Sequence, residues 1–272
     1  MSRCFLWICF FHFAVVACQS QAASEQPTVQ DTLITGNPTP VSVSTDTLAT
    51  PYDLNYVMGK FDPTVHPDFV VVDKKYANRE GMYLHKDTYA AFQKMHEAAL
   101  KDGVKLTVIS ATRNFEAQKR IWEAKWNGER LVKGDENLAK TTPDPKARAL
   151  KILLYSSMPS SSRHHWGTDL DINDLSLEYF EQPEGKKMYN WMQQHAAKYG
   201  FCQPYSPKGE ARPQGYEEEK WHWSYLPVAK PLTGLAARHL KDEYLTGFLG
   251  ASEAAKIGVV RNYVLGINQA CL

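Results

Sequence analysis

Two short stretches of the chain bring together residue types that bind a catalytic metal ion. The first, residues 162–171, reads SRHHWGTDLD and includes His164 and Asp171. The second reads EKWHW and includes Glu219 and His222. Two imidazoles and two carboxylates suffice for a catalytic zinc site, in which three protein ligands leave one position open for water. The fourth side chain can then take the proton of that water, so the two stretches indicate hydrolytic chemistry.

The first stretch has a spacing that fits a turn followed by a strand. His164 and Asp171 lie seven residues apart, so they are not the helical pair of an H-E-x-x-H metalloprotease. Gly167 permits a turn between them, and on the strand that follows Asp169 and Asp171 share one face. An imidazole from the turn and a carboxylate from the strand can therefore meet at one cation. Asp169 either orients a histidine from behind or is a solvated strand residue.

The second stretch places a histidine between two aromatic residues. On a strand, Trp221 and Trp223 face one way and His222 faces the other, toward the pocket. Glu219 would face away from His222 in a continuous strand, so we expect a bend or bulge around Lys220. With that bend, the carboxylate can reach the water as a general base.

The elements around these stretches predict an α+β fold, in which helices surround a small antiparallel sheet that carries the zinc site. The predicted strands are 69–72, 104–110, 168–172 and 221–226. The predicted helices are 87–103, 115–126, 145–154, 185–199, 235–245 and 252–264.

Three segments together resemble the D-Ala-D-Ala metallopeptidases, within the wider group that includes lysostaphin-type enzymes and the hedgehog signalling domain. Residues 162–171 are similar to the signature S-x-H-x-x-G-x-A-x-D, and residues 219–222 to E-x-W-H. Residues 110–118 are similar to S-x-Y-R-S-x-x-x-Q. The likeness covers roughly residues 52–227, with the segments in the family's order.

The resemblance implies a role for each matching residue. His164, Asp171 and His222 would bind one Zn²⁺, and Glu219 would be the base. Arg113 would contact the scissile carbonyl or the terminal carboxylate of the substrate, because a guanidinium offers a charged fork of donors to oxygen.

Other matching positions carry weaker implications or depart from the pattern. Ser162 and Gln118 would also bind substrate. His165 is an alternative ligand, although the spacing to Gly167 favours His164. The sequence departs from the signatures where Asp169 replaces a small Ala, and where Thr112 and Asn114 replace Tyr and Ser.

Members of that family cut the stem peptides of peptidoglycan, usually releasing a C-terminal D-Ala. The resemblance therefore implies a zinc-dependent carboxypeptidase with stem peptides as its partners. The bond remains open: D-Ala-D-Ala in pentapeptides, the L,D bond in tetrapeptides, or a cross-link cut by an endopeptidase. The alternative from another class is a non-catalytic envelope protein that uses a zinc-stabilised fold to bind a peptide or a protein.

Composition narrows the possible partners. The 272 residues include 31 basic and 30 acidic side chains, for a net charge of +1, and 43% are apolar. That is enough for one globular domain and an extra segment, and the charge gives no argument for nucleic acid. We expect a monomer, with membrane attachment only through its N-terminus.

The N-terminus predicts export to the cell envelope. Residues 1–18 form a signal sequence whose end, VVAC, is similar to a bacterial lipobox and implies acylation of Cys18. Ala22 and Ala23 offer an ordinary cleavage site instead, and a retained anchor is a further alternative. Residues 19–51 are a disordered tether rich in Ser, Thr and Pro. The zinc peptidase domain spans 52–272, including a C-terminal helical extension.

The position after Cys18 and the remaining cysteines refine that prediction. Gln19 follows Cys18, which in a two-membrane bacterium implies an outer-membrane lipoprotein on the periplasmic side. Cys202 and Cys271 are then the cysteines left in an oxidising compartment, and we expect a disulfide between them. The alternative is two separate buried thiols.

Overall fold

The computed structural model describes residues 51–272, which include the whole of the predicted domain 52–272. The signal sequence predicted for 1–18, the lipidation site Cys18 and nearly all of the tether 19–51 lie outside the described residues. Between residues 51 and 272, no helix is both long enough and apolar enough to cross a membrane.

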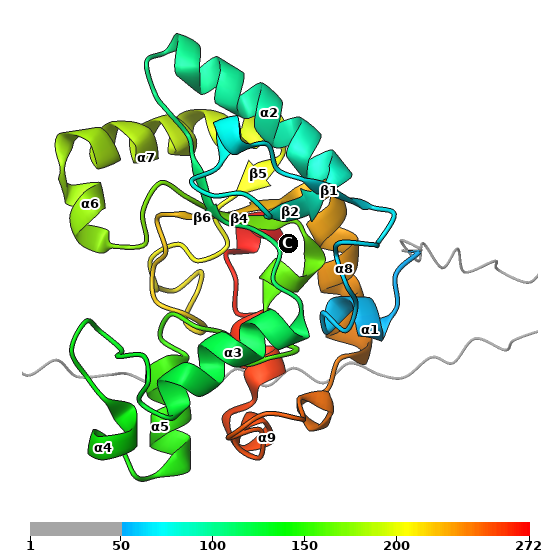
Figure 1. Cartoon of the computed structure of the whole chain (residues 1–272), viewed down its shortest axis with the longest axis vertical. Helices are drawn as coiled ribbons and strands as arrows, with labels where there is room; N and C mark the ends of the chain where they lie inside the picture. The colour runs from blue at the N-terminus through cyan, green and yellow to red at the C-terminus, as the bar shows by residue number, and fades with distance from the viewer. Residues whose placement is uncertain (1–50) are drawn as a thin grey trace, which may run out of the picture. The chain divides into compact units, whose positions relative to one another are not determined.

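The strands of the described chain form two antiparallel sheets (Figure 1). The larger has the order β3-β4-β6-β5, with β3 at Val108–Ser110, β4 at Asp169–Ile172, β6 at His222–Tyr225 and β5 at Phe201–Cys202. The smaller pairs β1 (Phe69–Val71) with β2 (Tyr83–His85). The fold is therefore α+β with small antiparallel sheets, which confirms the prediction.

The larger sheet has one apolar face and one polar face. On β4, Leu170 and Ile172 lie in a hydrophobic core, while Asp169 and Asp171 alternate onto the opposite face. The register places Asp171 opposite His222 of β6. The strand pairing therefore assembles carboxylates and an imidazole on the face away from that core.

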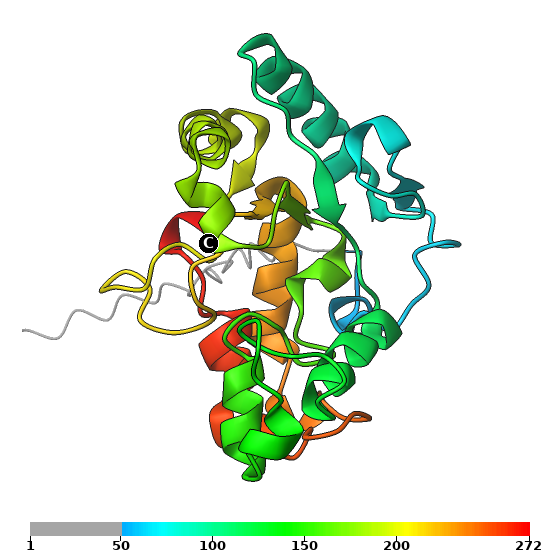
Figure 2. The same cartoon turned by 60° about the vertical axis from the view of Figure 1, so that its left-hand side comes forward.

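Two amphipathic helices cover the apolar face. Helix α2 (Lys86–Lys101) buries Phe92, Met95 and Ala99, the stripe predicted from the sequence. Helix α7 (Pro183–His195) buries Met188, Trp191 and Met192 in the same core. A 3₁₀ turn, η3 (Ala196–Tyr199), continues α7 and ends at Gly200. Figures 1 and 2 show α2 and α7 together on one side of the sheet.

A second hydrophobic core lies on the other side of the metal stretches. It is centred on large buried side chains such as Trp122 and Trp166. The helices that contribute to it are α1 (Leu54–Val57), α3 (Phe115–Trp126), α4 (Leu138–Thr141), α5 (Pro145–Ile152), α8 (Leu226–His239) and α9 (Glu253–Ile257). Figure 2 shows α8, in orange, extending from the sheet toward α9. The polar face of the sheet is thus enclosed between two cores.

Short elements complete the chain. They are η1 (Lys74–Tyr76), η2 (Arg163–Trp166), α6 (Leu177–Glu181), η4 (Asp242–Tyr244), η5 (Val260–Val264) and η6 (Gln269–Cys271). Of these, η2 matters most for function because it contains His164.

Several predicted boundaries were wrong near the C-terminus and before β3. Helix α8 begins at Leu226 rather than at 235, because Pro227 stands in the first turn, where its missing N–H is tolerated. The helix predicted for 252–264 is divided at Gly258, which has a φ of 69°. Strand β3 is confined to Val108–Ser110, shorter than the predicted 104–110.

Candidate metal centre

Three side chains predicted as ligands converge in the structure. His164, Asp171 and His222 each offer one donor atom, and these atoms lie within 4.8 Å of one another. His164 comes from η2, which ends at Gly167 with a φ of 72°, so the predicted turn precedes strand β4. All three side chains are almost completely buried.

The second nitrogen of each histidine is held from behind. His164 Nδ1 lies 2.9 Å from the backbone oxygen of Ala111. His222 Nε2 lies 2.8 Å from Asp169 Oδ2. These contacts leave His164 Nε2 and His222 Nδ1 to face Asp171, at 3.5 Å and 3.2 Å. Such contacts fix the ring orientation and the tautomer of metal-binding histidines.

The electrostatics of the cluster fit a cation. Asp171 Oδ1 is buried without a hydrogen-bond partner among the described residues. Burial alone would lower the pKa of His222, but Asp169, Asp171 and Glu219 outweigh it and raise that pKa well above its usual value. The surrounding carboxylates therefore favour positive charge at this point, and a divalent cation would supply it. Nitrogen and carboxylate donors suit zinc.

Asp169 is the centre of a buried polar network. It is fully buried, which excludes the alternative of a solvated strand residue. Its carboxylate accepts hydrogen bonds from Thr168 Oγ1 at 2.7 Å, Ser224 Oγ at 2.6 Å and Arg163 Nε at 3.1 Å. Burial alone would raise the pKa of Asp169, but Arg163 and His222 outweigh it and hold that pKa below its usual value. Asp169 therefore stays ionised behind His222.

Glu219 lies beside the ligands on the turn that precedes β6. The backbone amide of His222 donates to the backbone oxygen of Glu219 at 3.3 Å, and this turn is the bend predicted around Lys220. The turn brings Glu219 Oε2 to 3.2 Å from His222 Nδ1. The backbone amide of Glu219 donates to the backbone oxygen of Tyr205 at 2.9 Å. Burial raises the pKa of the Glu219 carboxyl. A buried base of raised pKa is typical of proton-transfer groups.

Arg113 reaches the cluster from the loop after β3. Its Nη1 lies 3.7 Å from Asp171 Oδ2 and donates to Ser110 Oγ at 2.5 Å. Its Nε donates to Gln118 Oε1 at 2.9 Å, and Gln118 in turn donates to the Ser157 oxygen at 2.8 Å. Gln118 is thus buried behind Arg113, with both ends of its amide engaged. Its place in the structure favours positioning of Arg113.

Ser162 and His165 occupy different positions around η2. Ser162 Oγ is buried without a hydrogen-bond partner in the described part of the chain, and Ser162 lies two residues before His164. His165 points elsewhere: its Nδ1 lies 2.5 Å from the Arg113 oxygen, and its Nε2 accepts from the Ser160 amide at 3.1 Å. Since both its nitrogens are engaged, His165 is not placed as a ligand.

Two residues that support the site were not predicted from the sequence. Arg163 is fully buried and donates to Thr233 Oγ1 and Ser224 Oγ, both at 2.9 Å, as well as to Asp169. The ring of Tyr205 packs 4.6 Å from the ring of His222. The only signal in the sequence for Arg163 was its place within the motif. Tyr205 lies in a predicted loop, and no sequence pattern indicated a role for it.

A disulfide joins Cys202 of β5 to Cys271 of η6, with their Cα atoms 5.7 Å apart. Beside it, the Asn268 amide donates to the Pro204 oxygen at 2.8 Å. The C-terminus is thereby attached to the segment that leads to Tyr205 and hence to the backbone of Glu219.

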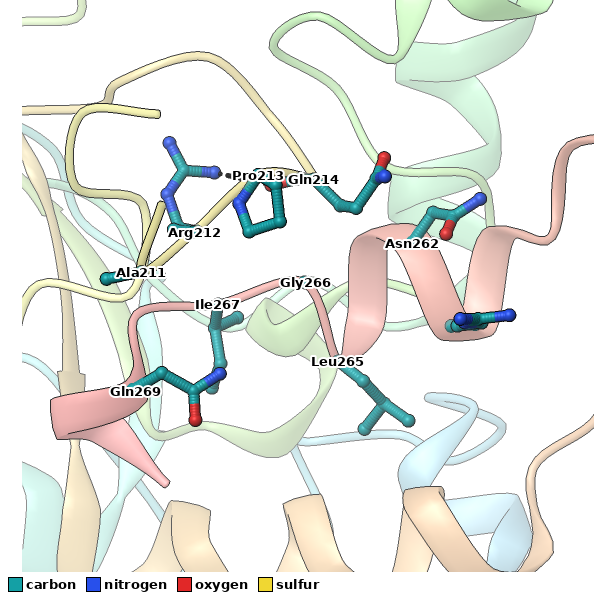
Figure 3. Close-up of a pocket in the computed structure, with 10 residues that line it drawn as sticks. Ala211, Arg212, Pro213, Gln214, Asn262, Leu265, Gly266, Ile267 and Gln269 are labelled. Atoms are coloured by element: carbon teal, nitrogen blue, oxygen red, sulfur yellow. Dashed lines mark hydrogen bonds between the residues drawn. The ribbon is translucent and has the colours of Figure 1, made fainter. Parts of the chain in front are cut away.

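A cavity near the C-terminus does not belong to the metal cluster. It has a volume of about 370 Å³ and lies between residues 211–214 and the segment 261–269 (Figure 3). The guanidinium of Arg212 is occupied by the backbone oxygens of Ser206, Gln214 and Tyr216. None of the predicted ligands or Glu219 lines this cavity.

Comparison with protein families agrees with the geometry. The family of VanY, D-alanyl-D-alanine carboxypeptidase, matches residues 81–228, which is more than half of the chain and includes both metal stretches. The chain belongs to the VanY D-alanyl-D-alanine carboxypeptidase family.

Two curated relatives are similar to part of this chain. YodJ of Bacillus subtilis (strain 168) is 29% identical over 197 residues, which are 69% of this chain and 60% of that protein. A D-alanyl-D-alanine carboxypeptidase of Enterococcus faecalis (strain ATCC 700802 / V583) is 29% identical over 136 residues, 50% of this chain and 46% of that protein. The chain therefore spans about half to three-fifths of the length of these two relatives.

Solved structures with some similarity include the LD-carboxypeptidase LdcB, with 24% identity and a TM-score of 0.46 over 61% of this chain and 70% of that one. VanYB in complex with D-alanine-D-alanine has 23% identity and a TM-score of 0.45 over 66% of this chain and 91% of that one. With TM-scores below 0.5, the family assignment rests on the match to the family itself.

Proposed function

We propose that this protein is a zinc-dependent carboxypeptidase that releases C-terminal D-Ala from the stem peptides of peptidoglycan. The observation that carries the proposal is the convergence of His164, Asp171 and His222 within 4.8 Å, with Glu219 Oε2 3.2 Å from one donor atom. Two nitrogen donors and one carboxylate, with a buried base beside them, fit a catalytic rather than a structural zinc site.

The metal would contribute one part of the chemistry. Zn²⁺ held by these donors would act as a Lewis acid and lower the pKa of a bound water toward about 7. Protein groups do the rest. Glu219 accepts a proton from the attacking water and then delivers it to the amine nitrogen of the departing D-Ala. Its burial supports both steps, because a raised pKa makes Glu219 a better acid–base catalyst near neutral pH.

Arg113 is the group best placed to bind substrate oxygen. Its Nε and Nη1 are held by Gln118 and Ser110, whereas Nη2 has no hydrogen-bond partner among residues 51–272. The side chain is 23% exposed, so a substrate can reach it. A guanidinium held in this way can stabilise the scissile carbonyl as negative charge develops on its oxygen. The unpartnered Ser162 Oγ is a second candidate donor to the substrate.

This function is consistent with export. Peptidoglycan lies outside the cytoplasm, so the substrate requires a location in the cell envelope. We therefore retain the signal sequence at 1–18 and the acylated Cys18 as part of the proposal. A mass spectrum of the mature N-terminus would show either a lipid-modified Cys18 or cleavage near Ala23.

The proposal is tested with defined peptides. The purified protein is incubated with a stem pentapeptide and a stem tetrapeptide, with and without a chelator, and then with zinc restored. We expect D-Ala release that stops with the chelator and returns with zinc, and the preferred peptide identifies the bond as D,D or L,D. Internal cleavage of a cross-linked dimer with no D-Ala released would instead indicate an endopeptidase. Intact peptides in the presence of bound zinc would refute hydrolysis and favour a binding protein.

A further inference from the structure

A second cavity adjoins the candidate metal centre through Arg113. It has a volume of about 480 Å³ and lies between the bend at residues 79–81 and helix α3. Four arginines line it, namely Arg79, Arg113, Arg120 and Arg130, and we call it the arginine pocket. The only carboxylate among the lining residues is Glu80. The wall of this cavity therefore carries a net positive charge.

Three of the four arginines of this pocket lack the partners that arginines usually find. Arg113 is 3.7 Å from Asp171 Oδ2, but in the described part of the chain Arg79, Arg120 and Arg130 have no carboxylate within 4.0 Å. Their side chains are exposed to solvent and make no hydrogen bond to another described residue. Mutually repelling charges gathered around one concave surface attract and concentrate anions.

The shape of the pocket is linked to a departure of this sequence from the family pattern. Thr112 lines the cavity and stands where the similar segments have a tyrosine. Its Oγ1 is buried without a hydrogen-bond partner among residues 51–272. A small side chain at this position leaves room beside Arg113, and its hydroxyl offers one more polar contact.

The volume exceeds what one terminal carboxylate requires. A single carboxylate needs no more than one guanidinium, and Arg113 offers Nη2, which has no hydrogen-bond partner among residues 51–272. A cavity of about 480 Å³ falls within the range of small-molecule sites and can accept a whole side chain. The three other guanidiniums of the pocket can therefore bind a second acidic group of the ligand.

We propose that the arginine pocket binds an internal carboxylate of the substrate peptide, distinct from the carboxylate of the residue that is released. The inference rests on the proposed function, since it assigns a feature of the substrate of that site. It makes the enzyme selective for stem peptides whose internal acid is free over those in which the same acid is amidated. The pocket provides binding and selectivity, while the groups that carry out hydrolysis remain those around Glu219.

The test compares two stem peptides that differ only in a free or amidated internal carboxylate. For the wild-type protein we expect kcat/KM to be about tenfold higher on the free acid, because a charge-assisted contact is worth roughly 1.4 kcal/mol or more. Arg120→Ala and Arg130→Ala should each remove most of this preference, by lowering kcat/KM more on the free acid than on the amide. Lys119→Ala is the matched control: it removes one positive charge from the same helix α3 but does not line the pocket, so the preference should remain.

Other outcomes overturn the inference. Equal kcat/KM for both peptides in the wild type, or an unchanged preference in both arginine variants, would show that the pocket does not read this carboxylate. A loss on acid and amide alike would assign the pocket to the terminal carboxylate. If inorganic phosphate removed the preference but neither arginine variant changed it, the effect of the anion would arise outside the arginine pocket.

A binding measurement separates this inference from the proposed function. Calorimetric titration of Glu219→Gln with the two peptides requires no turnover. Tighter binding of the free acid, abolished by adding Arg120→Ala, supports the arginine pocket even if the wild-type protein releases no D-Ala. Equal binding of both peptides by a protein that does release D-Ala would reject the pocket and leave the proposed function intact.

Discussion

His222 Nε2 lies 2.8 Å from Asp169 Oδ2, while the Nδ1 of the same ring faces Asp171 and Glu219, each at 3.2 Å. The ring is therefore held by one carboxylate and directed at two others. Asp169 in turn forms an ion pair with Arg163, whose side chain is fully buried. This arrangement explains how a carboxylate can replace a small residue of the family signature without leaving a buried charge unpaired.

Asp169→Asn should weaken zinc binding. The variant retains the shape of the side chain but removes the charge that orients His222 and pairs with Arg163. We expect zinc affinity to fall by about 10- to 100-fold, the usual cost of losing a carboxylate behind a metal-binding histidine. Competition with a chromogenic chelator measures this loss. Asp135→Asn, at an exposed position, should bind zinc like the wild type, and equal affinity in both variants would contradict the role of Asp169.

Glu219→Gln should strongly reduce turnover while zinc stays bound. Glutamine keeps the size of the side chain but cannot accept the proton of the attacking water. We expect kcat to fall by about 10²- to 10⁴-fold, the range attributed to general acid–base catalysis. Steady-state D-Ala release together with zinc analysis of the same sample measures both quantities. Glu218→Gln changes the neighbouring acid, whose Oε1 accepts from Tyr189, and should retain activity.

Lys125→Met should stabilise the protein at neutral pH. Burial, together with the nearby charges of Arg130 and Arg113, lowers the pKa of Lys125 to about 8. In the unfolded chain, lysine has its ordinary pKa of about 10.4, so between pH 8 and about pH 10.4 the unfolded state binds more protons than the folded state. Stability therefore rises with pH across this window in the wild type, and below it the charged lysine costs free energy.

The free energy of unfolding of the variant should exceed that of the wild type by about 1–3 kcal/mol at pH 7. The increase in stability that the wild type shows between pH 8 and 10 should be absent from the variant. Urea denaturation at several pH values measures both effects. Lys119→Met on the same helix serves as the control. A wild-type protein whose stability shows the same pH dependence as the variant would rule out this explanation.

Removing the disulfide should lower stability and loosen the support of Glu219. The bond between Cys202 and Cys271 closes a loop with a sequence separation of 69. Cys202→Ser with Cys271→Ser should cost about 2–4 kcal/mol, because the unfolded chain regains the freedom of that loop. Thermal unfolding of the variant and of the reduced wild type should agree. A midpoint that does not change in either case would show that the bond does not constrain the folded domain.

The parts of this molecule that follow local rules could be predicted from the sequence. Alternation along β4 put Asp169 and Asp171 on one face because side chains on a strand alternate with period two. The spacing of Glu219 and His222 demanded a bend, and the turn found there satisfies it. The stripe that includes Phe92 faces the core because it recurs at helical spacing.

The parts that depend on distant contacts could not be predicted in this way. The environment of Arg163 is set by Ser224 and Thr233, which lie far along the chain, so its burial left no local pattern. The arginine pocket combines the bend at Arg79 with one side of α3, and no spacing rule links those segments. Helix α8 was assigned the wrong start because Pro227 indicates either the end of a strand or the first turn of a helix.

The most direct test of the proposed zinc ligands is a crystal structure with anomalous data collected on both sides of the zinc absorption edge. One peak that appears only above the edge should lie about 2.0–2.2 Å from His164 Nε2, His222 Nδ1 and a carboxylate oxygen of Asp171. Glu219 should lie beside that peak without binding it. Zinc-soaked crystals that show no peak at this position, or a peak held by His165 instead, would contradict the ligand set on which the proposed function depends.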